Sequence, residues 1–261
     1  MIRLVITDDY MEMSRKAAEW IAGEMKQKPG LVLGLATGST PIGMYKELIE
    51  MYRKGQIDFS QVTTFNLDEY VGLHPEHPQS YHAYMWKHFF SHININKEHV
   101  NIPPGRFENE KDVCSRYDEK IKKSGGIDIQ ILGIGRNGHI GFNEPDSSLS
   151  IKTHIVNLAL ETIEANSRFF PQKDEVPKQA ITMGLGSIME AKTILLLANG
   201  RDKAAAIAKT LMGKVSTQIP ASLLQLHPNV TMIMDKEAAC FVTENKHVRE
   251  WSFAYQSEGI G

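Results

Sequence analysis

Cysteine is scarce in this 261-residue chain, which contains only Cys114 and Cys240. The two lie far apart and have none of the spacings typical of metal ligands, so neither a disulfide-rich scaffold nor a cysteine metal centre is indicated. A disulfide between them is compatible with the sequence, but two reduced thiols are the preferred interpretation. Reduced thiols favour a cytoplasmic location.

An excess of charge of one sign is also lacking. The formal net charge is −2, which argues against nucleic acid as the main partner, although a few local cations would suffice to bind a small anion. The longest apolar runs, Leu31–Ala36 and Ile194–Ala198, are far too short to span a bilayer. Met1–Tyr10 lacks the apolar core of a secretion signal. No linker or repeat is found, so a single domain over residues 1–261 is expected, with neither a nucleic-acid nor a membrane partner.

Short apolar runs of strand length instead alternate with amphipathic stretches of helix length. The expected strands are Leu31–Ala36, Val62–Asn66, Ile127–Ile134, Thr193–Ala198 and Val230–Met234. The expected helices are Pro41–Arg53, Lys111–Lys122 and Asp202–Leu211. Apolar strands separated by helices predict an α/β fold, with a mostly parallel sheet covered by helices on both faces. Such sheets bind ligands at the carboxyl ends of their strands, and polar segments follow several of these strands directly.

The first polar segment is Thr37-Gly38-Ser39-Thr40-Pro41. Gly38 lets the backbone approach a ligand, the hydroxyl groups can donate hydrogen bonds, and the start of a helix favours an anion. The segment therefore predicts a phosphate site, although a capped strand-to-helix turn has the same composition. It lacks the lysine of a Walker loop, so ATP is not indicated.

Paired acids follow the next strand, in Thr64-Phe-Asn-Leu-Asp68-Glu69-Tyr70. A carboxylate at this position can face the crevice and serve as a base. The alternative is a helix cap or a surface acid.

The segment richest in chemistry is Gly133-Ile-Gly-Arg-Asn137-Gly-His139-Ile-Gly-Phe-Asn-Glu144-Pro145. Its glycines allow a tight, exposed turn, and a carboxylate near a histidine orients the imidazole and stabilises its charged form. Such a pair suits proton transfer near neutral pH, whereas the alternative is a histidine bonded within its own loop.

Positive charge for an anionic ligand is available in Asn166-Ser-Arg168-Phe-Phe and in Asn199-Gly-Arg-Asp-Lys203-Ala. Lys203 is expected in the first turn of a helix, where a cation is unfavourable unless an anion joins it; Arg201 is the alternative occupant of this role. Metal ligation is the competing use of histidines, but His74, His77 and His82 are interrupted by prolines and form no recognisable zinc motif. We therefore expect no metal and no cofactor.

Three of these segments closely resemble the glucosamine-6-phosphate deaminase family. They are Thr64–Leu73, Gly133–Pro145 and Asn166–Phe170, and the similarity extends from Leu4 to about Asp235, which leaves a C-terminal tail from about residue 245. The resemblance implies a modified Rossmann-like fold without cofactor or metal. It also implies a cytoplasmic hydrolase of amino-sugar catabolism that converts glucosamine 6-phosphate to fructose 6-phosphate and ammonia.

The resemblance also implies roles for individual residues. Asp68 matches the base that moves a proton between C2 and C1 of the opened sugar, His139 the group that assists ring opening, and Glu144 its carboxylate partner. The residues that match the phosphate-binding set are Thr37, Gly38, Ser39, Arg168 and Lys203.

Two positions depart from the family pattern. Asn137 stands where several members have Asp, which leaves Glu144 as the acid beside His139. Members activated by N-acetylglucosamine 6-phosphate bind its phosphate with a Ser, an Arg and a Lys. Ser147 matches the first, but His154 and Val156 occupy the two basic positions, so the sequence predicts no activation of this type.

Two rival functions share this fold class. A sugar-phosphate lactonase has no need for an acid positioned at C2, and a sugar-phosphate sensor that regulates transcription normally carries an added DNA-binding helix pair. The set formed by Asp68, His139 and Glu144 favours the deaminase over both. Oligomerisation is left open.

Overall fold

A computed structural model of the chain describes residues 2–159, 163, 167, 170, 172 and 176–243. Its centre is a seven-stranded parallel sheet in the order β1-β10-β9-β6-β2-β3-β5. The strands of this sheet are β1 Ile2–Thr7, β2 Val32–Leu35, β3 Thr63–Asn66, β5 Val100–Asn101, β6 Ile129–Leu132, β9 Thr193–Ala198 and β10 Val230–Asp235. The predicted parallel sheet is thereby confirmed, and β1 is a strand that the sequence patterns did not reveal.

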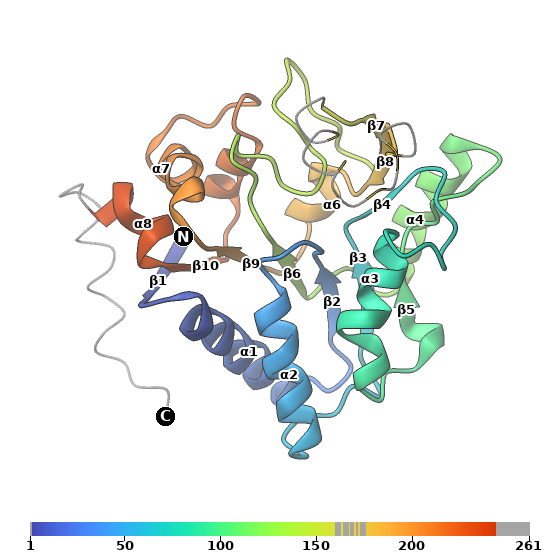
Figure 1. Cartoon of the computed structure of the whole chain (residues 1–261), viewed down its shortest axis with the longest axis horizontal. Helices are drawn as coiled ribbons and strands as arrows, with labels where there is room; N and C mark the ends of the chain where they lie inside the picture. The colour runs from blue at the N-terminus through green and yellow to red at the C-terminus, as the bar shows by residue number, and fades with distance from the viewer. Residues whose placement is uncertain are drawn as a thin grey trace.

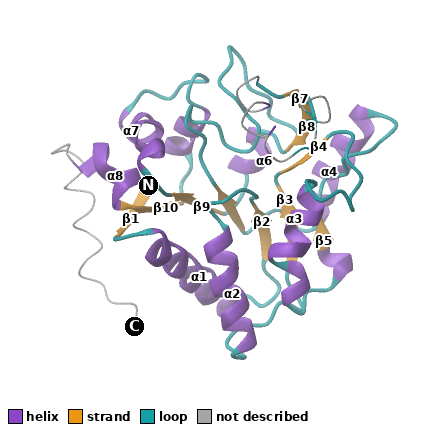
Figure 2. Cartoon of the chain, viewed as in Figure 1, coloured by secondary structure: helices purple, strands orange, loops and turns teal. Residues whose placement is uncertain are grey.

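Helices cover both faces of this sheet (Figure 1; Figure 2). In these views α1 and α2 lie below the sheet, whereas α6 and α7 lie above it. The described α-helices are α1 Tyr10–Gln27, α2 Ile42–Arg53, α3 Tyr81–His88, α4 Glu110–Lys123, α6 Leu185–Met189, α7 Ala204–Met212 and α8 Lys236–Thr243. Short 3-10 helices occur at Phe90–His92, Lys97–His99, Arg201–Lys203 and Pro220–Leu226. Within the residues that the structure describes, no helix is long and apolar enough to cross a membrane.

The sequence explains the central elements directly. β9 is a continuous apolar run in which every residue after Thr193 is buried, as expected for a strand covered on both faces. α1 begins after Asp9, whose side chain accepts a hydrogen bond from the backbone N–H of Glu12, and it buries Met13, Ala17 and Ile21 along one face. Both cysteines are free thiols.

A second, smaller sheet is antiparallel and was not predicted. It contains β4 Asp68–Tyr70, β8 Gln179–Thr182 and β7 His154–Asn157, in that order. Only Leu67 separates β4 from the end of β3, and the backbone of Leu67 bonds to Leu35 on one side and Met183 on the other. The acids Asp68 and Glu69 therefore belong to a short strand, rather than to a loop beyond the central sheet.

Candidate functional site

Most of the site residues that the sequence predicts line one cavity. It has a volume of 680 Å³ and lies where β2, β3, β6 and β9 end, which are neighbours in the central sheet. Its lining includes the predicted residues Thr37, Gly38, Ser39, Asp68, Asn137, His139 and Lys203. Glu144 contacts this set through His139. Arg168 lies outside the described residues.

Asp68 supplies the candidate base. It is the first residue of β4 and is only 6% exposed. Burial raises the pKa of Asp68 to about 8, and the neighbouring charge of Glu69 adds to the shift. A carboxylate with this pKa is a much stronger base than an ordinary aspartate, which suits abstraction of a proton from carbon.

His139 and Glu144 form the predicted pair. The Nδ1 atom of His139 lies 3.0 Å from Oε2 of Glu144. Because a carboxylate only accepts hydrogen bonds, Nδ1 carries a proton and Nε2 is the ring nitrogen that can exchange a proton with a ligand. Asn137 supports the pair: its Nδ2 donates to the same Glu144 oxygen over 2.6 Å, and its Oδ1 accepts the backbone N–H of His139 over 3.1 Å. An aspartate at this position could not make the first of these bonds without a proton of its own.

The approach of the His139 ring requires a glycine at position 135. A β-carbon on Gly135 would lie 2.3 Å from Cε1 of His139, well inside van der Waals contact. The backbone N–H of Gly135 also donates to the carbonyl of His139 over 2.9 Å. The absence of a side chain at Gly135 thus allows the backbone of the loop to pack directly against the His139 ring.

The loop at Thr37–Thr40 also lines the cavity. Gly38 has a φ of 96°, a left-handed conformation that explains the glycine. The loop is held from outside: the hydroxyl of Tyr84 donates to the carbonyl of Gly38 over 2.6 Å, and that of Tyr10 to the carbonyl of Ser39 over 3.1 Å. Its shape is therefore set by residues that do not line the cavity, as expected for a preformed binding loop.

Positive charge adjoins this loop. Lys203 ends the 3-10 helix Arg201–Lys203 and directly precedes the first turn of α7, in which the sequence predicts it, and it lines the cavity. Burial lowers the pKa of Lys203, and Arg136 contributes to the lowering, whereas Asp202 opposes it. Arg136 also lines the cavity and donates to Asp202 over 2.8 Å. Two cations beside one carboxylate leave this end of the cavity electropositive, which suits a phosphate group. Arg201, the alternative to Lys203, is exposed and does not line the cavity.

Two lining residues, Tyr81 and Arg136, were not singled out from the sequence. Tyr81 begins α3, and its ring stacks on Phe142 with centroids 6.2 Å apart. Its hydroxyl bonds to that of Tyr70 over 3.3 Å, and Thr37 is another hydrogen-bond partner. Ser80 is a recognisable helix cap that could have located α3, but an aromatic residue in a first turn is usually core.

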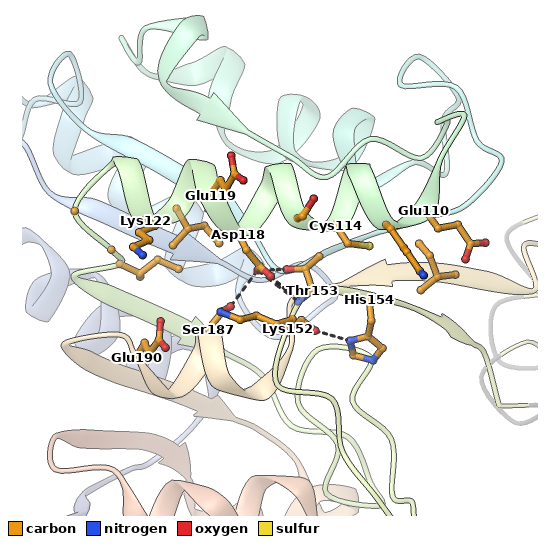
Figure 3. Close-up of a pocket in the computed structure, with 17 residues that line it drawn as sticks. Glu110, Cys114, Asp118, Glu119, Lys122, Lys152, Thr153, His154, Ser187 and Glu190 are labelled. Carbon is orange, nitrogen blue, oxygen red and sulfur yellow. Dashed lines mark hydrogen bonds between the residues drawn. The ribbon is translucent and has the colours of Figure 1, made fainter.

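A larger cavity, of 1070 Å³, lies beside α4, α6 and β7 (Figure 3). Its carboxylate Asp118 accepts hydrogen bonds from Thr153 and Ser187, and the Nδ1 atom of His154 bonds to the carbonyl of Lys152. Burial, with the charges of Asp118 and Glu110, raises the pKa of Cys114 to about 11, so this thiol is not a nucleophile near neutral pH. Asp118, Thr153 and Ser187 are therefore engaged in holding the fold.

The three positions compared with the effector site have different contacts. His154 lines the larger cavity, whereas Val156 packs in β7 against the cluster formed by Tyr70, Phe142 and Leu158. The hydroxyl of Ser147 donates to Asp146 over 3.0 Å.

The histidines considered as metal ligands bond locally. The Nδ1 atoms of His74 and His77 accept backbone N–H groups of Glu76 and Gln79, respectively. The Nε2 atom of His82 accepts the indole N–H of Trp86 over 3.1 Å.

Comparisons with known proteins place the chain in a family. Residues 8–233 match the family model described as glucosamine-6-phosphate isomerases/6-phosphogluconolactonase. The glucosamine-6-phosphate deaminase of Thermoanaerobacter pseudethanolicus is 60% identical over 93% of this chain and 96% of its own length. The glucosamine-6-phosphate deaminase of Halothermothrix orenii is 60% identical over 91% of this chain and 99% of its own length.

Solved structures support the same grouping. A monomeric glucosamine-6-phosphate deaminase has a TM-score of 0.88 and 47% identity, covering 91% of this chain and 99% of that one. The 6-phosphogluconolactonase of Thermotoga maritima, with a TM-score of 0.70 and 19% identity over 90% of this chain and all of that one, shares the fold. With one family model covering most of its length and relatives at 60% identity, the chain belongs to the glucosamine-6-phosphate isomerase and 6-phosphogluconolactonase family.

Proposed function

We propose that this chain is a glucosamine-6-phosphate deaminase, which converts glucosamine 6-phosphate and water to fructose 6-phosphate and ammonia. The observation that carries the proposal is the buried carboxyl of Asp68, whose pKa is raised to about 8, in the same cavity as His139. Relatives that share 60% of the sequence carry the name of this activity. The electropositive end formed by the Thr37–Thr40 loop and Lys203 suits the phosphate of such a substrate.

The proposed reaction consists of proton transfers between substrate and side chains. His139, oriented by Glu144, moves a proton from the O1 hydroxyl to the ring oxygen, and the pyranose opens to an aldehyde. Asp68 then removes the proton at C2 while the aldehyde oxygen O1 takes up a proton, which gives an enolamine. Asp68 returns its proton at C1 and the nitrogen gives up one proton, so that C1 carries a hydroxyl and C2 an imine. Water adds to that imine, the carbon–nitrogen bond breaks, and ammonia leaves a ketone.

A deaminase fits the cavity better than a lactonase does. Lactone hydrolysis needs water activated at an ester carbonyl, whereas aldose–ketose isomerisation needs a base strong enough to take a proton from carbon. The raised pKa of Asp68 serves the second requirement. The likeness to solved lactonases, at 19% identity for the one described above, concerns the fold.

The direct test is incubation of the purified chain with glucosamine 6-phosphate, with ammonia and fructose 6-phosphate measured separately. Equimolar formation of both is expected. Hydrolysis of 6-phosphogluconolactone without ammonia release from the amino sugar would contradict the proposal and favour the lactonase.

We further propose that the enzyme is cytoplasmic and works as one catalytic domain without metal or organic cofactor. The proton transfers above use side chains alone. Activity that survives exhaustive treatment with a chelator would agree with this part of the proposal. The tail from about residue 245 lies outside the described residues.

Replacing Lys203 with alanine is expected to raise KM for glucosamine 6-phosphate much more than it lowers kcat. A charge-assisted phosphate contact contributes on the order of 1.5–3 kcal/mol, or roughly ten- to a hundredfold in affinity. Lys209→Ala is the matched control, because Lys209 is exposed on α7, the helix that directly follows Lys203, and does not line the cavity. An unchanged KM in Lys203→Ala would place the phosphate elsewhere. Arg168→Ala is expected to act in the same direction.

N-acetylglucosamine 6-phosphate is expected not to activate the enzyme. A phosphate dianion needs compensating cations; at the two basic positions of the effector site this chain has the imidazole of His154 in place of a permanently charged side chain, and Val156, which has no donor at all. His154 and Val156 also lie in different surroundings, as described above. Kinetics in substrate should be hyperbolic and unchanged by millimolar effector. A sigmoidal curve that the effector makes hyperbolic would reveal an effector site built from other residues.

A further inference from the structure

Glu69 is a buried carboxyl group beside the candidate base that does not itself line the cavity. Adjacent residues of a strand point to opposite faces, and Asp68 lines the cavity while Glu69, only 2% exposed, points away from it. The Glu69 side chain accepts three backbone N–H groups. Its Oε1 accepts those of Tyr70 over 2.8 Å and Tyr81 over 2.9 Å, and its Oε2 accepts that of His82 over 2.9 Å.

Two of these three donors form the first turn of α3, Tyr81–His88. N–H groups at the start of a helix have no partner within it, and the helix dipole favours an anion there. Glu69 therefore fastens the start of α3 to the strand that carries Asp68.

α3 in turn holds the proposed phosphate loop. The Tyr84 hydroxyl donates to the carbonyl of Gly38 over 2.6 Å, and Tyr81 is a hydrogen-bond partner of Thr37. A continuous set of contacts thus runs from Asp68 through Glu69 and α3 to the loop at Thr37–Thr40. Together with the backbone bond between Leu67 and Leu35, this path holds Asp68 and the loop at a set distance, and hence the reacting carbons relative to the phosphate of one substrate molecule.

We propose that Glu69 is a positioning residue of the deaminase reaction: its carboxylate sets the place of the Thr37–Gly38 loop relative to Asp68, and its charge lies next to that of Asp68 on the same strand. The inference rests on the proposed function and deepens it. A displacement of about 1 Å between a catalytic group and a substrate anchor can cost on the order of a hundredfold in rate, so such a link has kinetic consequences.

The electrostatic part of the proposal has a defined sign. The charge of Glu69 acts together with burial to raise the pKa of Asp68. Among the described residues, the phenols of Tyr70, Tyr81 and Tyr117 also interact with Asp68, and burial raises the pKa of each, so they are neutral near pH 8. His139 and Lys203 line the same cavity. Burial raises the pKa of Glu69 itself, and its three N–H bonds oppose that shift.

The two parts can be separated by two substitutions at one position. Glu69→Gln keeps the length of the side chain and removes its charge. Glu69→Asp keeps the charge, but the shorter side chain cannot bond both to Tyr70 in its own strand and to the start of α3. Values of kcat and KM for glucosamine 6-phosphate, measured by ammonia release across the pH range, report on both parts.

In Glu69→Gln we expect the acid limb of the kcat/KM profile to move to lower pH, because a neighbouring negative charge has been removed. On the plateau above that limb, where Asp68 is ionised in both proteins, kcat/KM should fall by about tenfold or more, since a hydrogen bond to a charged group is lost. In Glu69→Asp the limb should stay near its original pH while KM rises and kcat falls.

Asp128→Asn is the matched control for a merely structural effect. Asp128 is 7% exposed and accepts the backbone N–H of Val32 over 2.8 Å, as well as Lys28 and Lys192, at the opposite end of the sheet. This variant should unfold at a lower temperature with its pH profile and KM unchanged.

An unmoved acid limb in Glu69→Gln, or an unchanged KM in Glu69→Asp, would overturn the inference while leaving an active enzyme. The same changes in Asp128→Asn would also overturn it, because they would follow from loss of stability alone. If the unaltered chain released no ammonia, the proposed function itself would fail.

Discussion

Replacing Asp68 with asparagine is expected to abolish turnover of glucosamine 6-phosphate while leaving its binding largely intact. The amide keeps the size of the carboxyl group but cannot accept the C2 proton. General acid–base catalysis by a positioned group contributes roughly 10²- to 10⁴-fold, so the loss in kcat should be of at least this size. Ammonia release measures turnover, and displacement of a competitive substrate analogue measures binding. Near-normal ammonia release would remove Asp68 from the mechanism.

The unaltered enzyme should depend on pH in a way that identifies the same group. Asp68 must be ionised to act as a base, and its pKa is raised to about 8, so kcat/KM should rise with pH and reach a plateau above about pH 8. An acid limb near the pKa of an ordinary aspartate, about 3.9, would contradict the raised pKa of Asp68.

Folding stability gives an independent check on Asp68. The pKa of Asp68 is higher in the folded protein than in the unfolded chain. At pH values between these two pKa values the folded protein therefore binds more protons, and its stability is lost as pH rises through the folded-state pKa. Asparagine does not titrate, so Asp68→Asn lacks this pH-dependent contribution to stability. The melting temperature of Asp68→Asn relative to the unaltered chain should therefore increase from about pH 5 to about pH 9. A difference that stays constant with pH would show that the Asp68 carboxyl is not desolvated.

The segments that build the cavity are predictable because each combines two local signals. A buried apolar strand such as Thr193–Ala198 can be recognised without knowing its partners, and the Gly-rich polar run after a strand marks its carboxyl end. In a parallel sheet these ends lie at one edge, so Thr37, Asp68, His139 and Lys203 are expected together before any contact is known.

What could not be predicted depends on pairings between distant parts of the chain. β4 has three residues and owes its strand conformation to β8, where Asp68 pairs with Thr182. The pair Asp68-Glu69 reads as two equivalent acids in sequence. Only the strand geometry assigns one carboxyl to the cavity and the other to the start of α3. The helix-cap alternative considered for these acids thus describes Glu69, whereas the catalytic interpretation concerns Asp68.

The edge strand β1 illustrates a different reason for failure. Its residues Ile2–Thr7 are only partly buried and include Arg3, so the segment lacks the uniform apolar character of the central strands. It becomes a strand because it pairs along its whole length with β10, Val230–Asp235. Local composition cannot report a partner more than two hundred residues away.

Replacing His139 with glutamine is expected to slow the reaction of the cyclic substrate far more than that of an analogue without the hydroxyl that closes the pyranose ring. The proposed role of His139 is to open that ring, and a substrate that has no pyranose form does not need this step. With the cyclic sugar, the loss should again be roughly 10²- to 10⁴-fold, the usual contribution of a positioned acid–base group. With the open-chain analogue, most of the activity should remain.

Glu144→Gln should reproduce this pattern in weaker form, because the 3.0 Å contact to Nδ1 orients the His139 ring without reaching the substrate itself. His154→Gln is the matched control, because the imidazole of His154 bonds to the carbonyl of Lys152 in the other cavity. Its reaction rates with both substrates should be unchanged. Equal losses on both substrates in His139→Gln would contradict the assignment. They would move His139 to a later proton transfer, one that the cyclic and open-chain compounds share, and Asp68 would then no longer be sufficient for the transfer from C2 to C1.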